Sequence, residues 1–210
     1  MTPFYLKQVE VGLMRNFNYL IGDPATRECA YVDPAWEVDR LLRLAREEGY
    51  RVKKILLTHN HFDHVEGVEE VVRLTGAEVY IHPNDEAPIK RGKARILHAN
   101  GGMEIKIGGL KIVALHTPGH TPGSTCYLID DLHLMTGDTL FQGNCGRCDL
   151  PGGDSKKLFE SLQQLKSLEP ATKVYPGHDY GHTPVTTIGY EKQHNPTLQS
   201  KYFREFEEIP

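Results

Sequence analysis

The sequence predicts an α/β fold in which two stacked β-sheets carry helices on both outer faces, a four-layer αββα sandwich. Two observations lead to this prediction. Each half of the chain contains a series of short apolar segments typical of strands, followed by a segment with helical periodicity. In addition, 39% of the 210 residues are hydrophobic, which is enough to fill a complete core.

The length favours one domain over two, because single α/β domains often reach this size. We therefore expect residues 1–210 to form one domain, in which residues from about 183 to 210 are a short C-terminal helical extension.

The composition argues against several kinds of partner. The formal net charge is −4 and positive and negative residues are interspersed along the chain, which argues against a broad cationic surface for nucleic acid. Residues 1–8 contain no cationic region followed by an apolar stretch, so we expect neither a signal peptide nor a membrane contact, and a cytoplasmic location. The four cysteines are too few for a disulfide scaffold and are expected to be reduced thiols: Cys29, Cys126, Cys145 and Cys148.

The N-terminal half is expected to begin with a meander of three strands: Phe4–Val11, Asn18–Ile21 and Cys29–Val32. A helix then begins at Asp33-Pro34 and ends at Gly49, because Pro is favoured in the first helical turn and Gly after the last one. Its apolar stripe has helical spacing: Val38, Leu41, Leu42 and Ala45. A buried strand, a helix ended by Gly76 and another strand follow: Lys53–Leu57, Val65–Leu74 and Glu78–His82.

The C-terminal half repeats this alternation. Four strands are expected: Met103–Ile107, Leu110–His116, Thr125–Ile129 and His133–Met135. A helix follows over Asp154–Leu168, and Asp154 is suited to cap its N-terminus. The strand Lys173–Tyr175 then leads into Gly177-His178, and helical segments from Val185 and from Thr197 close the chain.

A dense group of metal-binding side chains follows the buried strand of the N-terminal half. The segment reads Thr58-His-Asn-His-Phe-Asp-His64. Alternate residues of an extended segment point to the same side, so His59 and His61 are placed to bind one ion. Asp63 and His64, at the following turn, are placed to bind a second ion.

Three further side chains each follow a strand: His120, Asp138 and His178. Together with the first segment they give seven candidate metal ligands. We expect His59, His61 and His120 to bind one cation, and Asp63, His64 and His178 to bind the other, with Asp138 as a bridge. A bridge of this kind holds two cations roughly 3.5–4 Å apart, a separation at which a shared water becomes a hydroxide nucleophile. The pattern therefore predicts a hydrolase with two divalent metal ions, and nitrogen and oxygen ligands suit zinc, iron or manganese.

The order and placement of these motifs resemble the metallo-β-lactamase fold superfamily across nearly the whole chain. The segments that carry the resemblance are His-x-His-x-Asp-His64, Thr117-Pro-Gly-His-Thr-Pro-Gly123, Thr136-Gly-Asp-Thr139 and Tyr175-Pro-Gly-His178. Three segments are similar to the glyoxalase II branch: Gly137-Asp-Thr-Leu-Phe141, Gly146-Arg-Cys-Asp-Leu-Pro-Gly-Gly-Asp154 and Thr186-Thr-Ile-Gly-Tyr-Glu-Lys-Gln-His-Asn-Pro196. The resemblance implies an αββα sandwich with the metal ions at one edge of the sheets.

The resemblance also implies two substrate-binding residues. Related enzymes use an arginine near the turn after Asp138, and the Arg147 guanidinium would suit a substrate carboxylate. Tyr180 resembles a tyrosine that lines the glutathione pocket in glyoxalase II and in persulfide dioxygenases. Cys145 and Cys148 flank Arg147, and either incidental thiols or a regulatory or persulfide-carrying pair fits them. The remaining histidines are not expected to bind metal: His82, His98, His116, His133, His182 and His194. Of these, His116 is close enough in sequence to His120 to orient it through a hydrogen bond.

The function expected from these residues is hydrolysis of a small thioester, most simply hydroxyacyl-glutathione, by a metal-bound hydroxide. Asp63 would orient the nucleophile and Asp138 would bridge the ions. Glyoxalase II carries a sizeable helical domain after its last histidine, whereas about thirty residues follow His178, which leaves other small acyl thioesters open.

Three alternatives remain at this point. A mononuclear iron persulfide dioxygenase acting on glutathione persulfide would use His59, His120 and Asp138 as a facial triad around a single iron. A lactonase would use the same seven ligands. A metal-stabilised binding module would have no turnover.

Overall fold

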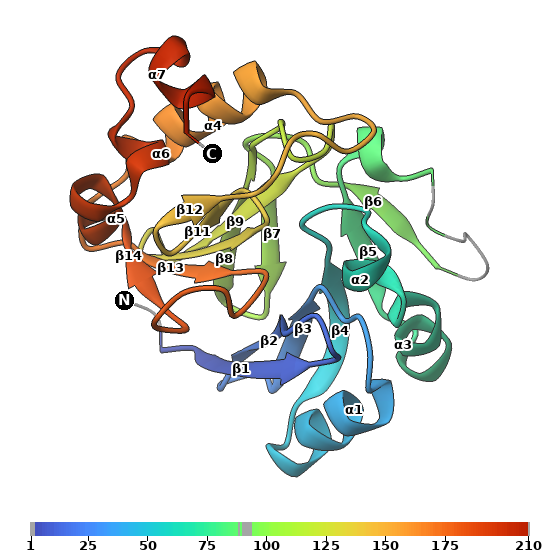
Figure 1. Cartoon of the computed structure of the whole chain (residues 1–210). Coiled ribbons are helices and arrows are strands. Elements are labelled where there is room, and N and C mark those ends of the chain that lie inside the picture. Colours follow the sequence, from blue (N-terminus) through green and yellow to red (C-terminus); the bar gives the residue numbers. More distant parts are fainter. Residues whose placement is uncertain (1–2, 88, 90–93, 210) are drawn as a thin grey trace.

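Two six-stranded mixed sheets lie face to face, and helices cover their outer faces (Figure 1). This arrangement confirms the expected αββα sandwich. The computed structural model describes residues 3–87, 89 and 94–209; the predicted domain of residues 1–210 also includes residues 1–2, 88, 90–93 and 210, which lie outside the described part.

The first sheet is formed by the N-terminal half. Its strands lie in sequence order: β1 (Tyr5–Val11), β2 (Asn16–Asp23), β3 (Glu28–Val32), β4 (Arg51–Leu56), β5 (Glu78–Ile81) and β6 (Ile96–His98). The meander β1–β2–β3 is antiparallel, and β3 to β6 are parallel. Helices α1 (Val38–Glu47) and α3 (Val68–Thr75) connect the parallel strands, and the short α2 (Phe62–Val65) and the 3-10 helix η1 (Pro83–Asp85) follow β4 and β5.

The second sheet is formed by the C-terminal half. Its strand order is β14 (Thr186–Thr187), β13 (Lys173–Pro176), β10 (His133–Gly137), β9 (Thr125–Ile129), β8 (Leu110–His116) and β7 (Glu104–Ile107). A two-stranded ribbon, β11 (Leu140–Phe141) and β12 (Asn144–Cys145), follows β10. The outer helices are α4 (Ser155–Lys166), α5 (Ile188–His194), α6 (Pro196–Gln199) and α7 (Phe203–Glu207).

Three apolar clusters fill the spaces between the four layers. Successive side chains of a strand point to opposite faces, and β2 illustrates the consequence. Its Leu20 packs under α1 and α3, whereas Tyr19 and Ile21 pack between the two sheets against Ile112 and Tyr127. The third cluster joins the second sheet to the C-terminal helices, with Leu158, Leu162 and Leu165 of α4 at its centre.

Two predicted helix boundaries in the N-terminal half were wrong. The first helix begins at Val38 and not at Asp33-Pro34, because Asp33 has φ 49° and its carboxylate accepts hydrogen bonds from the Thr58 loop. The predicted helix Val65–Leu74 is split into α2 and α3. The split occurs at Gly67, where a Cβ would lie 2.6 Å from the carbonyl oxygen of Ala35, so the chain approaches the preceding loop too closely for a side chain.

In the C-terminal half the predicted strands and the α4 helix are present. The predicted cap of α4 is confirmed, because Asp154 Oδ1 accepts a hydrogen bond from the Lys157 backbone N–H at 3.0 Å. The helix expected from Val185 begins at Ile188 after the short strand β14. The sequence did not predict four short strands: β6, β11, β12 and β14.

Candidate metal centre

The carboxyl ends of β4, β10 and β13 meet at one edge of the two sheets and deliver most of the predicted ligands. After β4 ends at Leu56, His59 and His61 lie in the following loop, and Asp63 and His64 lie on α2. His59 and His64 are almost completely buried, with exposed fractions of 1% and 0%. Asp138 follows β10, His178 follows β13, and His120 lies in the loop between β8 and β9.

Glycine is required where two of these loops cross. A Cβ at Gly137, which has φ 48°, would lie 2.3 Å from Thr58 Oγ1, and a Cβ at Gly177 would lie 2.3 Å from Asp138 Oδ1. The Gly177 backbone N–H also donates to the Gly137 carbonyl at 2.8 Å. The absence of side chains therefore allows the Asp138 and His178 loops to approach the Thr58 loop closely.

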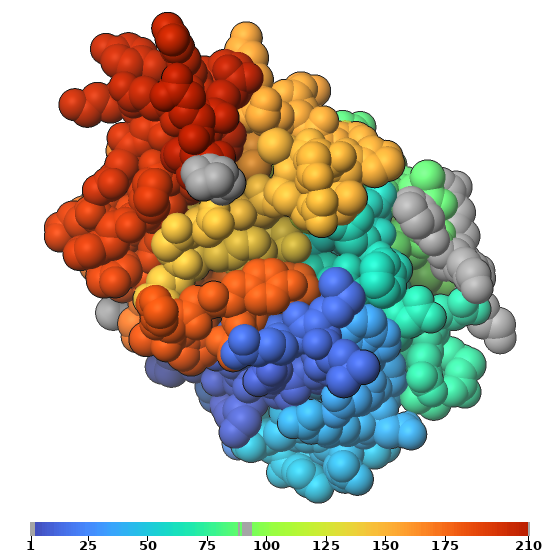
Figure 2. Space-filling view, in the orientation of Figure 1, coloured from blue at the N-terminus to red at the C-terminus, as the bar shows by residue number. Residues whose placement is uncertain are grey.

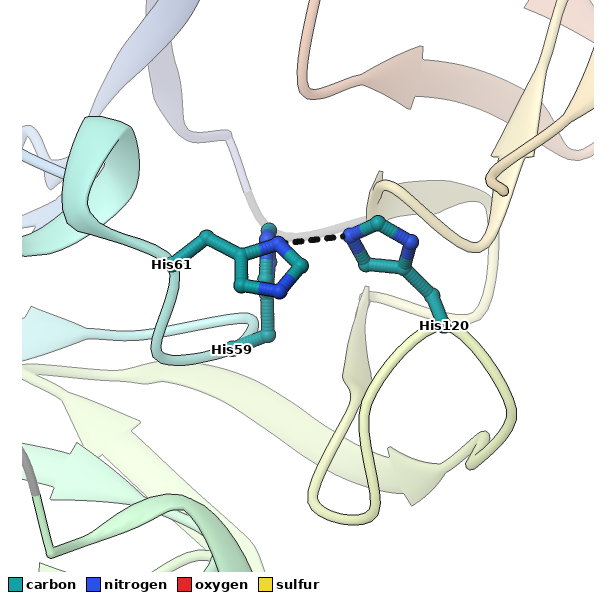
Figure 3. Close-up of side chains that lie close together, drawn as sticks. All are labelled: His59, His61 and His120. Carbon is teal, nitrogen blue, oxygen red and sulfur yellow. Dashed lines mark hydrogen bonds between the residues drawn. The ribbon is translucent and has the colours of Figure 1, made fainter. Parts of the chain in front are cut away.

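The first ligand group consists of His59, His61 and His120. One side-chain nitrogen from each lies within 4.8 Å of the others. Figure 3 shows the three rings converging from two loops, with His61 Nδ1 and His120 Nε2 only 2.9 Å apart.

The second group consists of Asp63, His64 and His178, again with donor atoms within 4.8 Å of one another. His64 Nε2 and His178 Nε2 are 3.2 Å apart, and Asp63 Oδ2 lies 3.4 Å and 3.3 Å from these nitrogens. A third set, Asp33, His59 and His64, meets the same distance limit. However, the Asp33 carboxylate faces His64 Nδ1, which points away from the second group.

Asp138 lies between the two groups. Its Oδ1 is 3.4 Å from His64 Nε2, and its Oδ2 is 3.4 Å from His178 Nε2 and 3.6 Å from His120 Nε2. One carboxylate thus reaches residues of both groups, as a bridging ligand requires. The structure brings all seven predicted residues together, and their role as ligands remains a proposal.

The chemistry of these side chains fits cations. Two pairs of imidazole nitrogens face each other at hydrogen-bond distance, an arrangement that is explained when both lone pairs point toward a positive ion. Among the described residues, four buried side-chain polar atoms lack a hydrogen-bond partner, and two of them, His59 Nε2 and Asp138 Oδ1, belong to the predicted ligands. Buried polar groups are normally paired, so these two atoms indicate a missing ligand.

Electrostatics in the centre also favour positive charge. Burial would lower the pKa of His178, but hydrogen bonds and charge interactions with Asp138 and Asp63 raise it to about 10. Burial would raise the pKa of Asp138, yet the neighbouring His64 and His178 hold it below its usual range. The two carboxylates therefore remain ionised and are ready to bind cations.

Four of the histidines are oriented through their second ring nitrogen. His59 Nδ1 lies 3.0 Å from Thr58 Oγ1, and His64 Nδ1 lies 3.0 Å from Asp33 Oδ2. His120 Nδ1 contacts the Arg147 carbonyl at 2.6 Å, and His178 Nδ1 contacts the Met14 carbonyl at 2.9 Å. Such contacts fix the tautomer and direct Nε2 into the centre.

Sequence reasoning missed several of these supporting groups. Asp33 accepts hydrogen bonds from the Thr58 backbone N–H and hydroxyl at 2.7 Å and 2.6 Å, in addition to its contact with His64. The Asn16 amide donates to the carbonyl and to Oδ2 of Asp63, both at 2.9 Å. The expected partner of His120 was wrong: His116 donates to the Pro122 carbonyl and stacks on His82, while Arg147 supports His120.

A cavity of about 480 Å³ opens onto both ligand groups. Besides ligand residues it is lined by Met14, Phe62, Phe141, Leu150 and Tyr180, and by Arg147. The Tyr180 ring stacks on the His178 ring with centroids 4.5 Å apart. The Arg147 guanidinium donates two hydrogen bonds of 2.6 Å to the Asp149 carboxylate at the surface. Both predicted substrate residues thus lie at the cavity, and their contact with substrate remains a proposal.

Cys145 and Cys148 are free thiols on either side of Arg147. Burial raises the pKa of Cys145 to about 12, so this thiol is protonated at neutral pH.

Comparison with known proteins agrees with this geometry. The model of the metallo-β-lactamase superfamily matches residues 13–178. A probable polyketide biosynthesis zinc-dependent hydrolase, PksB of Bacillus subtilis, is 34% identical over 91% of this chain and 86% of its own length. The hydroxyacylglutathione hydrolase of Pseudomonas entomophila is 34% identical over 89% of this chain and 71% of its own length. The mitochondrial persulfide dioxygenase ETHE1 of Homo sapiens is 33% identical over 94% of this chain and 77% of its own length.

Two solved structures extend these similarities. ETHE1 from Myxococcus xanthus superposes with a TM-score of 0.88 at 34% identity and covers 98% of this chain and 92% of its own. TTHA1623 in a di-iron-bound form gives a TM-score of 0.79 at 36% identity, covering 90% of this chain and 98% of its own. Over the part of the chain that the structure describes, no helix has the length and apolar character needed to cross a membrane.

Proposed function

The chain belongs to the metallo-β-lactamase superfamily as a metal-dependent hydrolase, and we propose that its substrate is a small thioester, best represented by hydroxyacyl-glutathione. The observation that carries this proposal is the pair of three-ligand groups with Asp138 between them at the floor of one cavity. The named relatives include a zinc-dependent hydrolase and a hydroxyacylglutathione hydrolase, which supports hydrolysis as the reaction.

Zinc or iron suits the His and Asp donors of the two groups. When bound, a pair of such cations supplies a hydroxide nucleophile near neutral pH and neutralises negative charge on a carbonyl oxygen.

The protein side chains provide the positioning. We propose that Asp63, held by the Asn16 amide and close to His64 and His178, keeps a fixed orientation at the second group and orients the nucleophile. A thioester needs no strong general acid, because a thiol with a pKa of about 8.5 is a good leaving group. The chain therefore has to bind and orient the substrate and to exclude water around the reacting carbonyl.

Arg147 and Tyr180 are the proposed substrate residues. Arg147 lines the cavity, and its guanidinium already holds a carboxylate, that of Asp149, in a two-bond geometry. A substrate carboxylate would exchange with Asp149 at this position. The Tyr180 ring is 56% exposed and stacked on His178, so its free face and hydroxyl are available to a substrate.

A second candidate is the persulfide dioxygenase reaction. Two observations favour it: the similarity to ETHE1 proteins, and the position of Asp138 next to His120, which with His59 makes a two-histidine, one-carboxylate set for a single iron. The two groups and Asp138 offer seven donor residues, more than the three that this reaction needs, which is why we favour the hydrolase.

The two candidates differ in metal content and in product. The protein is purified, its metal is quantified, and it is tested for thiol release from S-lactoylglutathione and for oxygen uptake with glutathione persulfide. Two metal ions per chain with thiol release are expected. One iron per chain with oxygen uptake and no thiol release would overturn the proposal in favour of the dioxygenase. Hydrolysis of a lactone without thiol release would instead identify a lactonase.

A further inference from the structure

Large apolar side chains are exposed around the opening of the cavity. Among the described residues, seven large hydrophobic side chains are exposed, and four of them lie near this opening. They are Leu13 and Met14 in the turn between β1 and β2, Phe62 at the start of α2, and Tyr180 between β13 and β14. We call these four residues the apolar mouth. Their exposed fractions are 101%, 40%, 61% and 56%, so all four carry surface that the fold leaves in water. Apolar surface gathered next to a site is a frequent mark of ligand contact.

The apolar mouth is continuous with the catalytic cavity. Met14, Phe62 and Tyr180 line the cavity directly, and Leu13 precedes Met14 in the turn between β1 and β2. In Figure 2 the blue β1–β2 turn and the teal α2 segment meet the orange segment that contains residue 180 on the face shown. Phe141 and Leu150 are further apolar residues of the cavity lining, from the segment that also carries Arg147.

The β1–β2 turn is held in place by His178 of the candidate metal centre and by Asp179, which follows it. The Met14 carbonyl is the partner of His178 Nδ1, and the Asp179 backbone N–H donates to the Arg15 carbonyl at 2.9 Å. Arg15 and Asp179 also form an ion pair. Met14 is thus part of a preformed wall.

Phe62 is also held in place by a neighbouring side chain. Its ring makes an edge contact with Trp36, with centroids 6.3 Å apart. Gly12 lies against the same Trp36 ring so closely that a Cβ there would be 2.0 Å from it. Trp36 therefore connects the turn that carries Leu13 and Met14 to the start of α2.

Charge divides the cavity into two sides. Arg147, with Asp149 bound to it, marks the side near β12. Arg15, next to the apolar mouth, does not line the cavity and is paired with Asp179 and Glu10, so Arg147 is the arginine that a charged group in the cavity meets. A substrate whose thiol part is polar and whose acyl part is apolar matches the two sides.

From this arrangement we infer that the apolar mouth is a subsite for the acyl chain of the substrate, and that the protein prefers thioesters with medium-length alkyl acyl groups. The inference rests on the proposed thioester hydrolysis, because it places the scissile carbonyl at the ligand groups and the chain along Phe62 and Met14. Burial of alkyl groups against these side chains is the source of the preference.

The test uses a series of S-acylglutathiones in which only the acyl chain changes, from acetyl to octanoyl. The metal-loaded wild type is expected to show kcat/KM rising about twofold per added methylene, below the roughly fourfold gain of complete burial. In Phe62→Ser the ratio of kcat/KM for octanoyl to that for acetyl falls about tenfold, and Phe62→Leu restores most of it. Metal content is measured for each variant, since Phe62 lies between His61 and Asp63.

Leu74→Ser is the matched control. Leu74 is also an exposed apolar residue, at 47%, but it lies on α3 away from the catalytic cavity. Both acetyl and octanoyl kinetics should remain those of the wild type in this variant.

A binding measurement separates the subsite from the reaction. Octanoate is expected to bind the metal-loaded protein at least tenfold more tightly than butanoate by calorimetry, and Phe62→Ser should remove this difference. Chain-length-dependent binding without hydrolysis of any thioester would overturn the proposed function and leave the subsite standing. Hydrolysis at the same kcat/KM from acetyl to octanoyl, with equal binding of the two carboxylates, would overturn the subsite and leave the hydrolase.

Discussion

Single residues build the candidate metal centre either as predicted metal ligands or as groups that orient those ligands. The sequence indicated the ligands but not the orienting groups. His59, His61, Asp63 and His64 were recognisable because they are concentrated in one short segment. Asp33, which orients His64, lies 31 residues away and is next to a proline, so it gave the pattern of a helix start. The Met14 and Arg147 contributions come from backbone carbonyls, which carry no residue-type signal.

Asp33→Asn tests the role of this buried carboxylate. The amide can accept fewer hydrogen bonds than the carboxylate, so Thr58 and His64 lose part of their orientation. Metal affinity is expected to fall about 10–100-fold. The measurement is competition with a chelator, and Asp23→Asn is the control because Asp23 is also buried but caps a turn away from the centre. Equal losses in the two variants would assign only a general folding role to Asp33.

His82 gives the fold a pH dependence outside the metal centre. Burial and the neighbouring His116 lower the pKa of His82 to about 4, whereas the unfolded value is near 6.5. Between these values the unfolded chain binds more protons, so the free energy of unfolding falls as the pH drops from about 6.5 to 4.

His82→Gln is expected to remove about 2 kcal/mol of this loss, less than the full shift because the comparison ends at pH 4.5, above the pKa of the folded ring. The comparison is made by urea unfolding at pH 7 and pH 4.5 with metal chelated in both proteins. Parallel losses of stability in wild type and variant would contradict the assignment.

At the scale of helices and strands, an element could be predicted when its apolar residues repeated regularly over enough positions. The long strands and α1, α3 and α4 were predicted because their apolar residues repeat over enough positions to define a face. Strands β11, β12 and β14 have two residues each, too few for any alternation. The separation of α2 from α3 depends on a close contact at Gly67 with a loop about thirty residues earlier, which no local pattern contains.

The β11–β12 ribbon depends on one buried carboxylate of α5. Glu191 has an exposed fraction of 0% and accepts hydrogen bonds from the Gly143 backbone N–H at 2.8 Å, from Thr186 Oγ1 at 2.6 Å and from Asn195 Nδ2 at 2.9 Å. Asn195 in turn donates to the Phe141 and Asn144 carbonyls. The helical extension therefore fixes the ribbon that lines the cavity.

Glu191→Ala should leave these donors without partners and lower the free energy of unfolding by about 3 kcal/mol. Because the ribbon carries Phe141 and Cys145 of the cavity, KM should rise as well. Urea unfolding and steady-state kinetics measure the two effects. Glu160→Ala, an exposed position on α4, should change neither.

At the scale of the whole molecule, each ligand group combines residues from both sheets. His59 and His61 come from the first half and His120 from the second, and Asp63 and His64 are joined by His178 in the same way. The sequence predicted this convergence because the ligands follow strand ends, and the family resemblance is confirmed by the match over residues 13–178. The number of domains and the cytoplasmic location remain predictions.

Metal should therefore stabilise the docking of the two halves. At free zinc about a hundredfold above its Kd, the melting temperature should be about 5–10 °C higher than in the chelated protein. Scanning calorimetry measures the difference. Magnesium, which prefers six oxygen ligands, is the control and should give no increase. An unchanged melting temperature would mean that zinc does not bind the folded chain in preference to the unfolded chain, which would contradict the two proposed ligand groups.

The division of the ligands has a consequence for the nascent chain. While the ribosome has synthesised only the first sheet, His59, His61, Asp63 and His64 are present without their third partners. The first coordination set becomes available when residue 120 has emerged, and the second only when residue 178 has emerged. For the proposed two-ion centre, ion capture at both positions is thus a late step of biosynthesis, and a translation product that stops short of β13 cannot form that centre.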